Sequence, residues 1–296
     1  MKSKTQIAHL LRKISFVATA IAAILQAVAM FTEFEPNTNY FYSGAILPTV
    51  ACVFAVLGAL LGTVAALLIP AKLLRGSIFR NSRSVLPPSA IGFLLAGVLL
   101  LATARGTLGT ATALPVLIAT AYAAMSGTPH MRADYKVTVV LLGFVAVAAC
   151  ITLNAYYYFD FSIEMNSPIK VAVQLAILLT MLALTGELRF ILGIEKPRTQ
   201  LILFAWVQSM GALSSVALPL AFLLGVDIRA DYVAGAILVL AVTVTQYLQT
   251  RQLISSSYRI CKHEEEEALI ESASGDPESP YTAPEDLQNK NSEDEQ

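Results

Sequence analysis

The sequence is short of charge. Only 14% of its 296 residues are Asp, Glu, Lys or Arg, whereas 56% are hydrophobic, and the mean hydropathy is +0.64. Because soluble globular domains carry about 25% charged residues, these values exclude an ordinary soluble domain. Apolar runs of about 18 or more residues recur along the chain, each long enough to cross about 30 Å of hydrocarbon. The sequence therefore predicts a multi-pass protein of the cell membrane.

Cysteine and histidine are also scarce. Cys52, Cys150 and Cys261 have no paired spacing, which argues against a disulfide framework and against a zinc site. The three histidines are scattered and lie outside the apolar runs. We therefore expect no metal and no cofactor.

The motifs of common catalytic sites are missing. The chain contains no HExxH, GxxxxGK[ST], GxSxG or GxGxxG sequence. No nucleophile with a base and no pair of aspartates lies inside an apolar run, where such groups stand out against Leu and Ala. The sequence predicts no catalytic residue, so we expect neither an enzyme nor a nucleic-acid partner.

Eight apolar segments are present, which predicts an all-α bundle of about eight transmembrane helices. The third and fourth segments are separated only by residues 105–107, where Gly106 suits a tight hairpin. In an alternative with seven spans, these two segments form one re-entrant pair. The predicted spans are residues 14–32, 45–69, 88–104, 108–125, 137–155, 169–188, 201–224 and 232–250.

Lys and Arg are distributed unevenly around these spans. Sixteen of them flank span ends on the same side of the membrane as the N-terminus, whereas only Arg105, Lys170 and Arg229 lie on the opposite side. Because cytoplasmic loops are enriched in Lys and Arg, we expect both termini in the cytoplasm. Residues 1–29 also fit a cleaved signal peptide, with a basic start, an apolar stretch and the sequence AVA at its end.

Charge also divides the chain along its length. Residues 1–262 hold nineteen Lys and Arg against nine acidic residues, whereas residues 263–296 hold one lysine against twelve acidic residues. The second segment has few apolar residues and cannot offset its chain entropy by burial. We expect a transmembrane helical domain over 1–262 and a disordered, acidic cytoplasmic tail over 263–296.

An aromatic segment, AYYYFDFSIEMNSPIK, joins the fifth and sixth spans at residues 155–170. Tyrosines at the depth of the lipid headgroups anchor membrane helices, with the ring in lipid and the hydroxyl in water. We expect such a belt here, and an external ligand site is the alternative. The expected belt residues are Tyr156, Tyr157, Tyr158, Phe159 and Phe161.

Polar residues mark both ends of the sixth span. Asn166, Lys170 and Gln174 are spaced four apart and would share one helical face, lining a vestibule for a polar or anionic solute. The alternative is a snorkelling lysine beside a glutamine bonded to a neighbouring helix. At the other end, Glu187 would be a proton or cation ligand at a gate, or else a plain boundary residue, and Arg189 needs a separate partner.

Prolines interrupt three predicted spans, at Pro48, Pro115 and Pro219. Interrupted membrane helices expose backbone carbonyls and occur at transporter sites. Proline is also ordinary in membrane helices, so a broken-helix site is one of two interpretations.

Two stretches, AYYYFDFSIEMNSPIKVAVQ and GELRFILG, resemble segments of uncharacterised eight-span membrane proteins of Gram-positive bacteria. The similarity covers residues 155–193, about an eighth of the chain. It implies no activity or ligand, but it supports the choice of the polar residues of the sixth span as candidate site residues.

Two functional classes fit these observations. We favour a small-solute transporter, or the membrane subunit of one, and the alternative is a non-transporting sensor or scaffold that engages partners through its cytoplasmic loops and acidic tail. The expected partners are membrane lipids and another membrane or cytoplasmic subunit. The candidate residues of a polar stripe or gate are Asn166, Lys170, Gln174, Glu187 and Arg189.

Overall fold

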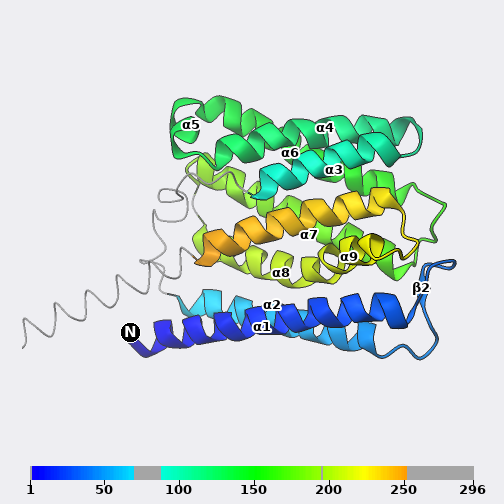
Figure 1. The fold of residues 1–296 in the computed structure, drawn as a ribbon. Coiled ribbons are helices and arrows are strands. Elements are labelled where there is room, and N and C mark those ends of the chain that lie inside the picture. Colours follow the sequence, from blue (N-terminus) through cyan, green and yellow to red (C-terminus); the bar gives the residue numbers. More distant parts are fainter. Residues whose placement is uncertain (1, 70–87, 195, 252–296) are drawn as a thin grey trace, which may run out of the picture. The chain divides into compact units, whose positions relative to one another are not determined.

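A computed structural model describes residues 2–69, 88–194 and 196–251 (Figure 1). All of these residues belong to one compact unit. The acidic segment 263–296 lies outside the described residues, so its disorder and the boundary at residue 262 stay predictions.

The described residues form an all-α bundle, which confirms the predicted fold class. Seven helices are long and apolar enough to cross a membrane, and an eighth apolar helix, α3, has 16 residues. These eight apolar segments coincide in order with the eight predicted spans. The helices are α1 (Lys2–Thr32), α2 (Leu47–Leu68), α3 (Pro88–Thr103), α4 (Gly106–Ser126), α5 (Pro129–Asp134), α6 (Lys136–Tyr158), α7 (Pro168–Ile191), α8 (Pro197–Ser215), α9 (Ala217–Leu223) and a last described helix, Ala230–Arg251.

Successive long helices run in opposite directions, so the two ends of the bundle carry different connections (Figure 1). At one end, a hairpin of β1 (Phe34–Glu35) and β2 (Tyr40–Phe41) links α1 to α2, with Phe34 paired to Phe41. We call this the hairpin end, and it is the end expected outside the cell. The opposite end, called the N-terminal end, carries the start of α1, the short helix α5 and the connection from α7 to α8.

The tight connection between α3 and α4 depends on Gly106. This residue has φ +74°, a left-handed conformation that glycine adopts without strain. The chain therefore reverses within a few residues, and α3 and α4 pack against each other as an antiparallel pair.

Small residues allow close contacts between the helices. α2 packs against α1 and α8 through Gly58 and Gly62. A Cβ atom added at Gly58 would lie 2.8 Å from Thr19 Oγ1, and one added at Gly62 would lie 2.6 Å from Ala205 Cβ. Close approach of backbones at such positions is a usual source of helix association in membranes.

Of the three span prolines, only Pro219 accompanies an interruption. The apolar stretch Pro197–Leu223 breaks at Val216, between α8 and α9. Pro219 lacks the N–H that would bond to the carbonyl of Ser215, four residues earlier, which explains the break. The expected interruption is wrong for Pro115, which lies inside a continuous α4, and for Pro48, which occupies the first turn of α2, where its missing N–H needs no partner.

Candidate functional site

The structure divides the aromatic segment into a buried and an exposed group. Tyr156 and Tyr157 are only 4% and 0% exposed, whereas Tyr158, Phe159 and Phe161 are exposed. The expected lipid-facing belt is therefore wrong for the first two residues. They continue the buried face of α6, and their hydroxyls find partners inside the bundle.

Those partners belong to a saturated network around Asp231, which is 2% exposed and begins the last described helix. Tyr156 donates to Asp231 Oδ2 at 2.6 Å, and Tyr157 donates to the Asp231 backbone carbonyl at 2.6 Å. Arg229 donates from Nε to Oδ1 at 3.1 Å and from a second nitrogen to Oδ2. The backbone N–H of Tyr232 also donates to Oδ1, at 3.1 Å. Both carboxylate oxygens therefore accept more than one hydrogen bond.

Arg229 extends this network to Asp160, in the loop after α6. One guanidinium nitrogen lies 2.6 Å from Asp160 Oδ2. Partial burial favours the neutral form of Asp160, but hydrogen bonds from Ser162 and the charge of Arg229 outweigh it, so the pKa of Asp160 lies below its ordinary value. Burial likewise opposes the charged form of Arg229, but hydrogen bonding and attraction to Asp231, then to Asp160, raise its pKa above the ordinary value.

Lys170 supports the same loop from α7. It is 0% exposed, and its Nζ donates to the backbone carbonyls of Asp160 at 2.6 Å and Ile163 at 3.2 Å. The lysine therefore holds the loop through its backbone carbonyls. Asn166 is exposed and precedes the first residue of α7, while Gln174 is half-buried on the helix. A solute-binding role for these three residues stays a prediction.

Glu187 lies near the other end of α7. It follows Lys170 by 17 residues, which is about 25 Å along a helix axis. Glu187 is 7% exposed, whereas Arg189 is exposed on another face of the helix. The five candidate residues thus occupy separate places, and Glu187 is the one that faces a pocket inside the bundle.

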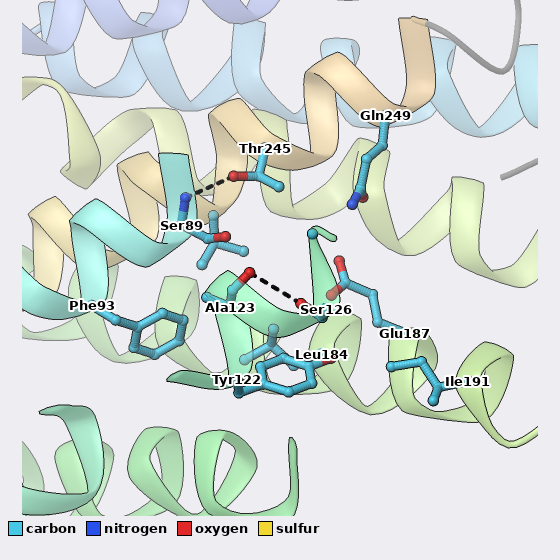
Figure 2. A pocket seen from close by; sticks show the side chains of 12 residues that line it. Ser89, Phe93, Tyr122, Ala123, Ser126, Leu184, Glu187, Ile191, Thr245 and Gln249 are labelled. Atoms are coloured by element: carbon cyan, nitrogen blue, oxygen red, sulfur yellow. Dashed lines mark hydrogen bonds between the residues drawn. The ribbon is translucent and has the colours of Figure 1, made fainter. Parts of the chain in front are cut away.

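This pocket has a volume of about 20 Å³ and lies between α3, α4, α7 and the last described helix (Figure 2). Figure 2 shows the Glu187 carboxylate between Ser126 and Gln249. A cavity of this size holds about one water molecule. Its polar and aromatic lining consists of Ser89, Phe93, Tyr122, Ser126, Glu187, Thr245 and Gln249.

Several described polar atoms around Glu187 are buried without a well-formed hydrogen bond. They are the hydroxyl of Tyr122, both amide atoms of Gln246 and Oε1 of Gln249. Tyr122 and Gln246 nevertheless lie close enough to act on the Glu187 carboxyl group as weak hydrogen-bond donors, and Arg132 of α5 acts on it through its charge. Because buried polar atoms in native proteins nearly always have partners, the pocket has the character of a site for water or for a small polar solute.

The unpaired atoms continue from the pocket into the bundle. On the last described helix, Thr243, Gln246 and Gln249 are spaced three residues apart, and each has a buried polar atom without a partner. α8 faces this helix through Gly211, where an added Cβ would lie 3.2 Å from Thr243 Oγ1. Ser215, one turn further along α8, is 0% exposed and its hydroxyl is also unpaired. The row therefore runs from the Glu187 pocket toward the break in α8.

Sequence reasoning missed both Asp231 and the polar row. The available signals were an Arg-x-Asp sequence at residues 229–231 and the glutamines at 246 and 249 inside an apolar span. Neither signal identifies which helix lies opposite, and that neighbour decides whether the polar atoms are paired.

Within the described residues, no group of three or more His, Cys, Asp or Glu is placed to hold a metal ion. No family model matches the chain, and no curated protein or solved structure is similar to it. The resemblance to eight-span proteins of Gram-positive bacteria therefore stays a prediction.

Proposed function

We propose that this membrane protein passes a small solute, as a transporter or as the membrane subunit of one, and that Glu187 binds the solute. The observation that carries this proposal is a buried carboxylate in a pocket where neighbouring polar atoms lack a well-formed hydrogen bond. Ionisable groups inside a membrane bundle are costly to bury, and they mark substrate and ion pathways.

The position of Arg132 supports a gate at this pocket. Arg132 belongs to the six-residue helix α5 at the N-terminal end, and its charge acts on the Glu187 carboxyl group. A displacement of α5 would remove the compensating charge from Glu187. Because α5 lies at the end expected to face the cytoplasm, this movement would control access from that side.

The break in α8 supports a path beyond the gate. The carbonyl of Ser215 loses its helical partner because Pro219 has no N–H, and the Ser215 hydroxyl is buried and unpaired. Interrupted helices supply carbonyl and hydroxyl groups to substrate sites in transporters. A solute leaving Glu187 would meet Gln246, Thr243 and then Ser215.

Transport by the purified protein in liposomes tests this proposal. Currents on a solid-supported membrane would be recorded after concentration jumps of cations, anions and amino acids, and vesicle shrinkage would report neutral solutes. We expect the wild type to pass at least one class. Glu187→Gln should reduce that flux by about tenfold or more, equivalent to about 1.4 kcal/mol of binding.

Asp227→Asn is the control, because Asp227 is an exposed acid that lies outside the Glu187 pocket and outside α5. This variant should retain wild-type flux. Equal flux in wild type and Glu187→Gln would remove Glu187 from the path. Flux no higher than in empty liposomes across the whole panel would contradict transport and favour a sensor or scaffold.

A further inference from the structure

A second pocket lies between α7 and α8 at the N-terminal end. Its volume is about 140 Å³, and its lining includes the cations Arg189 and Lys196. Arg189 is on the exposed face of α7, whereas Glu187 faces the interior, so this pocket is separate from the proposed solute site.

The wall of this pocket is built by a close contact between the two helices. A Cβ atom added at Gly186 would lie 1.7 Å from Gln200 Oε1, so a larger residue there would force the Gln200 amide to move. Gln200 is 2% exposed, and its Nε2 donates to the Ala183 carbonyl at 2.9 Å. This hydrogen bond fixes α8 against α7 beside the pocket.

The lining changes from charged to apolar with depth. On α7, Leu182 precedes Arg189 by seven residues. Lys196 immediately precedes α8, and Leu203 follows it by seven residues. Seven residues correspond to about 10 Å along a helix. The two cations therefore lie near the end of the bundle, while the two leucines lie deeper in the membrane-spanning part.

An exposed apolar stripe leads along α7 into this pocket. Val171, Leu175, Leu178 and Leu182 share one face of the helix and are between 40% and 49% exposed. With the same spacing, this face continues to Arg189. A lipid chain packed on the stripe would bring its headgroup to the arginine.

The charge of the pocket is uncompensated among the residues that the structure describes. None of the described lining residues is acidic, and the described ion pairs do not include Arg189 or Lys196. Glu195 lies outside the described residues, so the test below includes its removal. Two cations over an apolar cleft match a phosphate group joined to acyl chains, whereas a free anion would leave the apolar walls unused.

We propose that this pocket binds one anionic phospholipid. Arg189 and Lys196 hold its headgroup phosphate, and an acyl chain lies on Leu182 and the stripe above it. The proposal is independent of solute passage, since it uses a different face of α7.

Native mass spectrometry of the delipidated full-length protein tests the proposal. The protein would be titrated with phosphatidylglycerol and with phosphatidylcholine carrying identical acyl chains. We expect one phosphatidylglycerol to bind about tenfold more tightly than phosphatidylcholine, a difference of about 1.4 kcal/mol. The double variant Arg189→Gln/Lys196→Gln should bind both lipids equally.

The matched control is Lys4→Gln/Lys13→Gln, which removes two exposed cations of α1 from the same end of the bundle. It should keep the preference, as should Glu195→Gln. Thr199→Trp, which fills the pocket and leaves the cations in place, should lose it. Size-exclusion profiles would confirm that each variant is folded.

Three results would overturn the proposal. They are equal binding of the two lipids by the wild type, a preference that survives in Arg189→Gln/Lys196→Gln, and binding of inorganic phosphate as tight as that of phosphatidylglycerol. The last result would assign the pocket to a free anion.

Discussion

Two buried carboxylates lie on helices of this membrane bundle, and their surroundings differ. Asp231 is 2% exposed and Glu187 is 7% exposed, and each interacts with one arginine. Both oxygens of Asp231 accept several hydrogen bonds. Around Glu187, by contrast, the hydroxyl of Tyr122 and the amide of Gln246 lie near the carboxylate without a well-formed hydrogen bond. The first arrangement fastens helices together, and the second has room for a partner that is not part of the chain.

The contrast also concerns the two ends of the bundle. At the hairpin end, the Asp231 network joins α6, the loop after it and the last described helix. The α3–α4 turn is joined as well, because the backbone N–H of Arg105 donates to the Tyr156 hydroxyl at 3.2 Å. At the N-terminal end, the Glu187 pocket is surrounded by buried polar atoms without a well-formed hydrogen bond. We therefore expect changes at the hairpin end to affect stability and changes near Glu187 to affect flux.

The largest stability effect is expected from Asp231→Ala. It removes the acceptor of the Tyr156 hydroxyl and one of the two carboxylates that Arg229 contacts. Breaking a buried ion pair costs about 3–5 kcal/mol, and because Arg229 keeps its contact with Asp160, we expect a loss near the lower end of that range. Thermal unfolding in detergent would measure the loss. Asp227→Ala is the control, because Asp227 is an exposed acid in the same loop. Similar losses in both variants would show that the network does not fasten the hairpin end.

A smaller difference is expected between two buried tyrosines. Tyr157→Phe removes the hydrogen bond to the Asp231 carbonyl and should cost about 1–2 kcal/mol. Tyr122→Phe removes an unpaired hydroxyl and should change stability by less than about 0.5 kcal/mol. Unfolding curves recorded in the same detergent compare the two directly. A larger loss from Tyr122→Phe would mean that its hydroxyl is bonded within the bundle.

Gln246→Leu should leave stability within about 0.5 kcal/mol of the wild type, because the Gln246 amide makes no well-formed hydrogen bond to the rest of the chain. The same variant should lower solute flux. The neighbouring residue, Thr245, provides the contrast, because its Oγ1 accepts a hydrogen bond from the Ser89 N–H at 2.9 Å. Thr245→Val should therefore be destabilising. If both variants destabilise equally, the polar row is part of the structural framework.

The smallest effect concerns pH. The pKa of Asp160 is lower in the folded protein than its ordinary value of 3.8. The resulting stability is fully present above that value and is lost as the pH falls through the lower, folded-state pKa. Melting temperatures recorded from pH 5 to pH 3 should therefore fall less steeply for Asp160→Asn than for the wild type. Identical slopes would show that Asp160 does not contribute.

Much of the fold follows from the sequence, because crossing a bilayer requires long apolar runs and such runs are visible in one chain. Gly106 and Pro219 also act through local backbone geometry, so a tight turn and an interruption were predictable there. The orientation of side chains was less accessible. Tyr156 and Tyr157 look like interfacial anchors, and only the packing of α6 against the last described helix turns them inward.

The candidate site was predictable only in part. Glu187 stands out as an acid within an apolar span, but the residues around it come from three other helices that are remote in the sequence. Their pairing state depends on which helices become neighbours. The same reason explains why Asp231 was missed, since its partners include a tyrosine 75 positions earlier in the chain.

We expect the Glu187 pocket to hold water and the saturated Asp231 network to be dry. Hydroxyl-radical footprinting by X-ray radiolysis tests this expectation directly, because radicals formed from bound water modify adjacent side chains. Tyr122 and Tyr157 form a matched pair, at 1% and 0% exposure. We expect Tyr122 to be modified much faster than Tyr157. Equally slow modification of both tyrosines would contradict it.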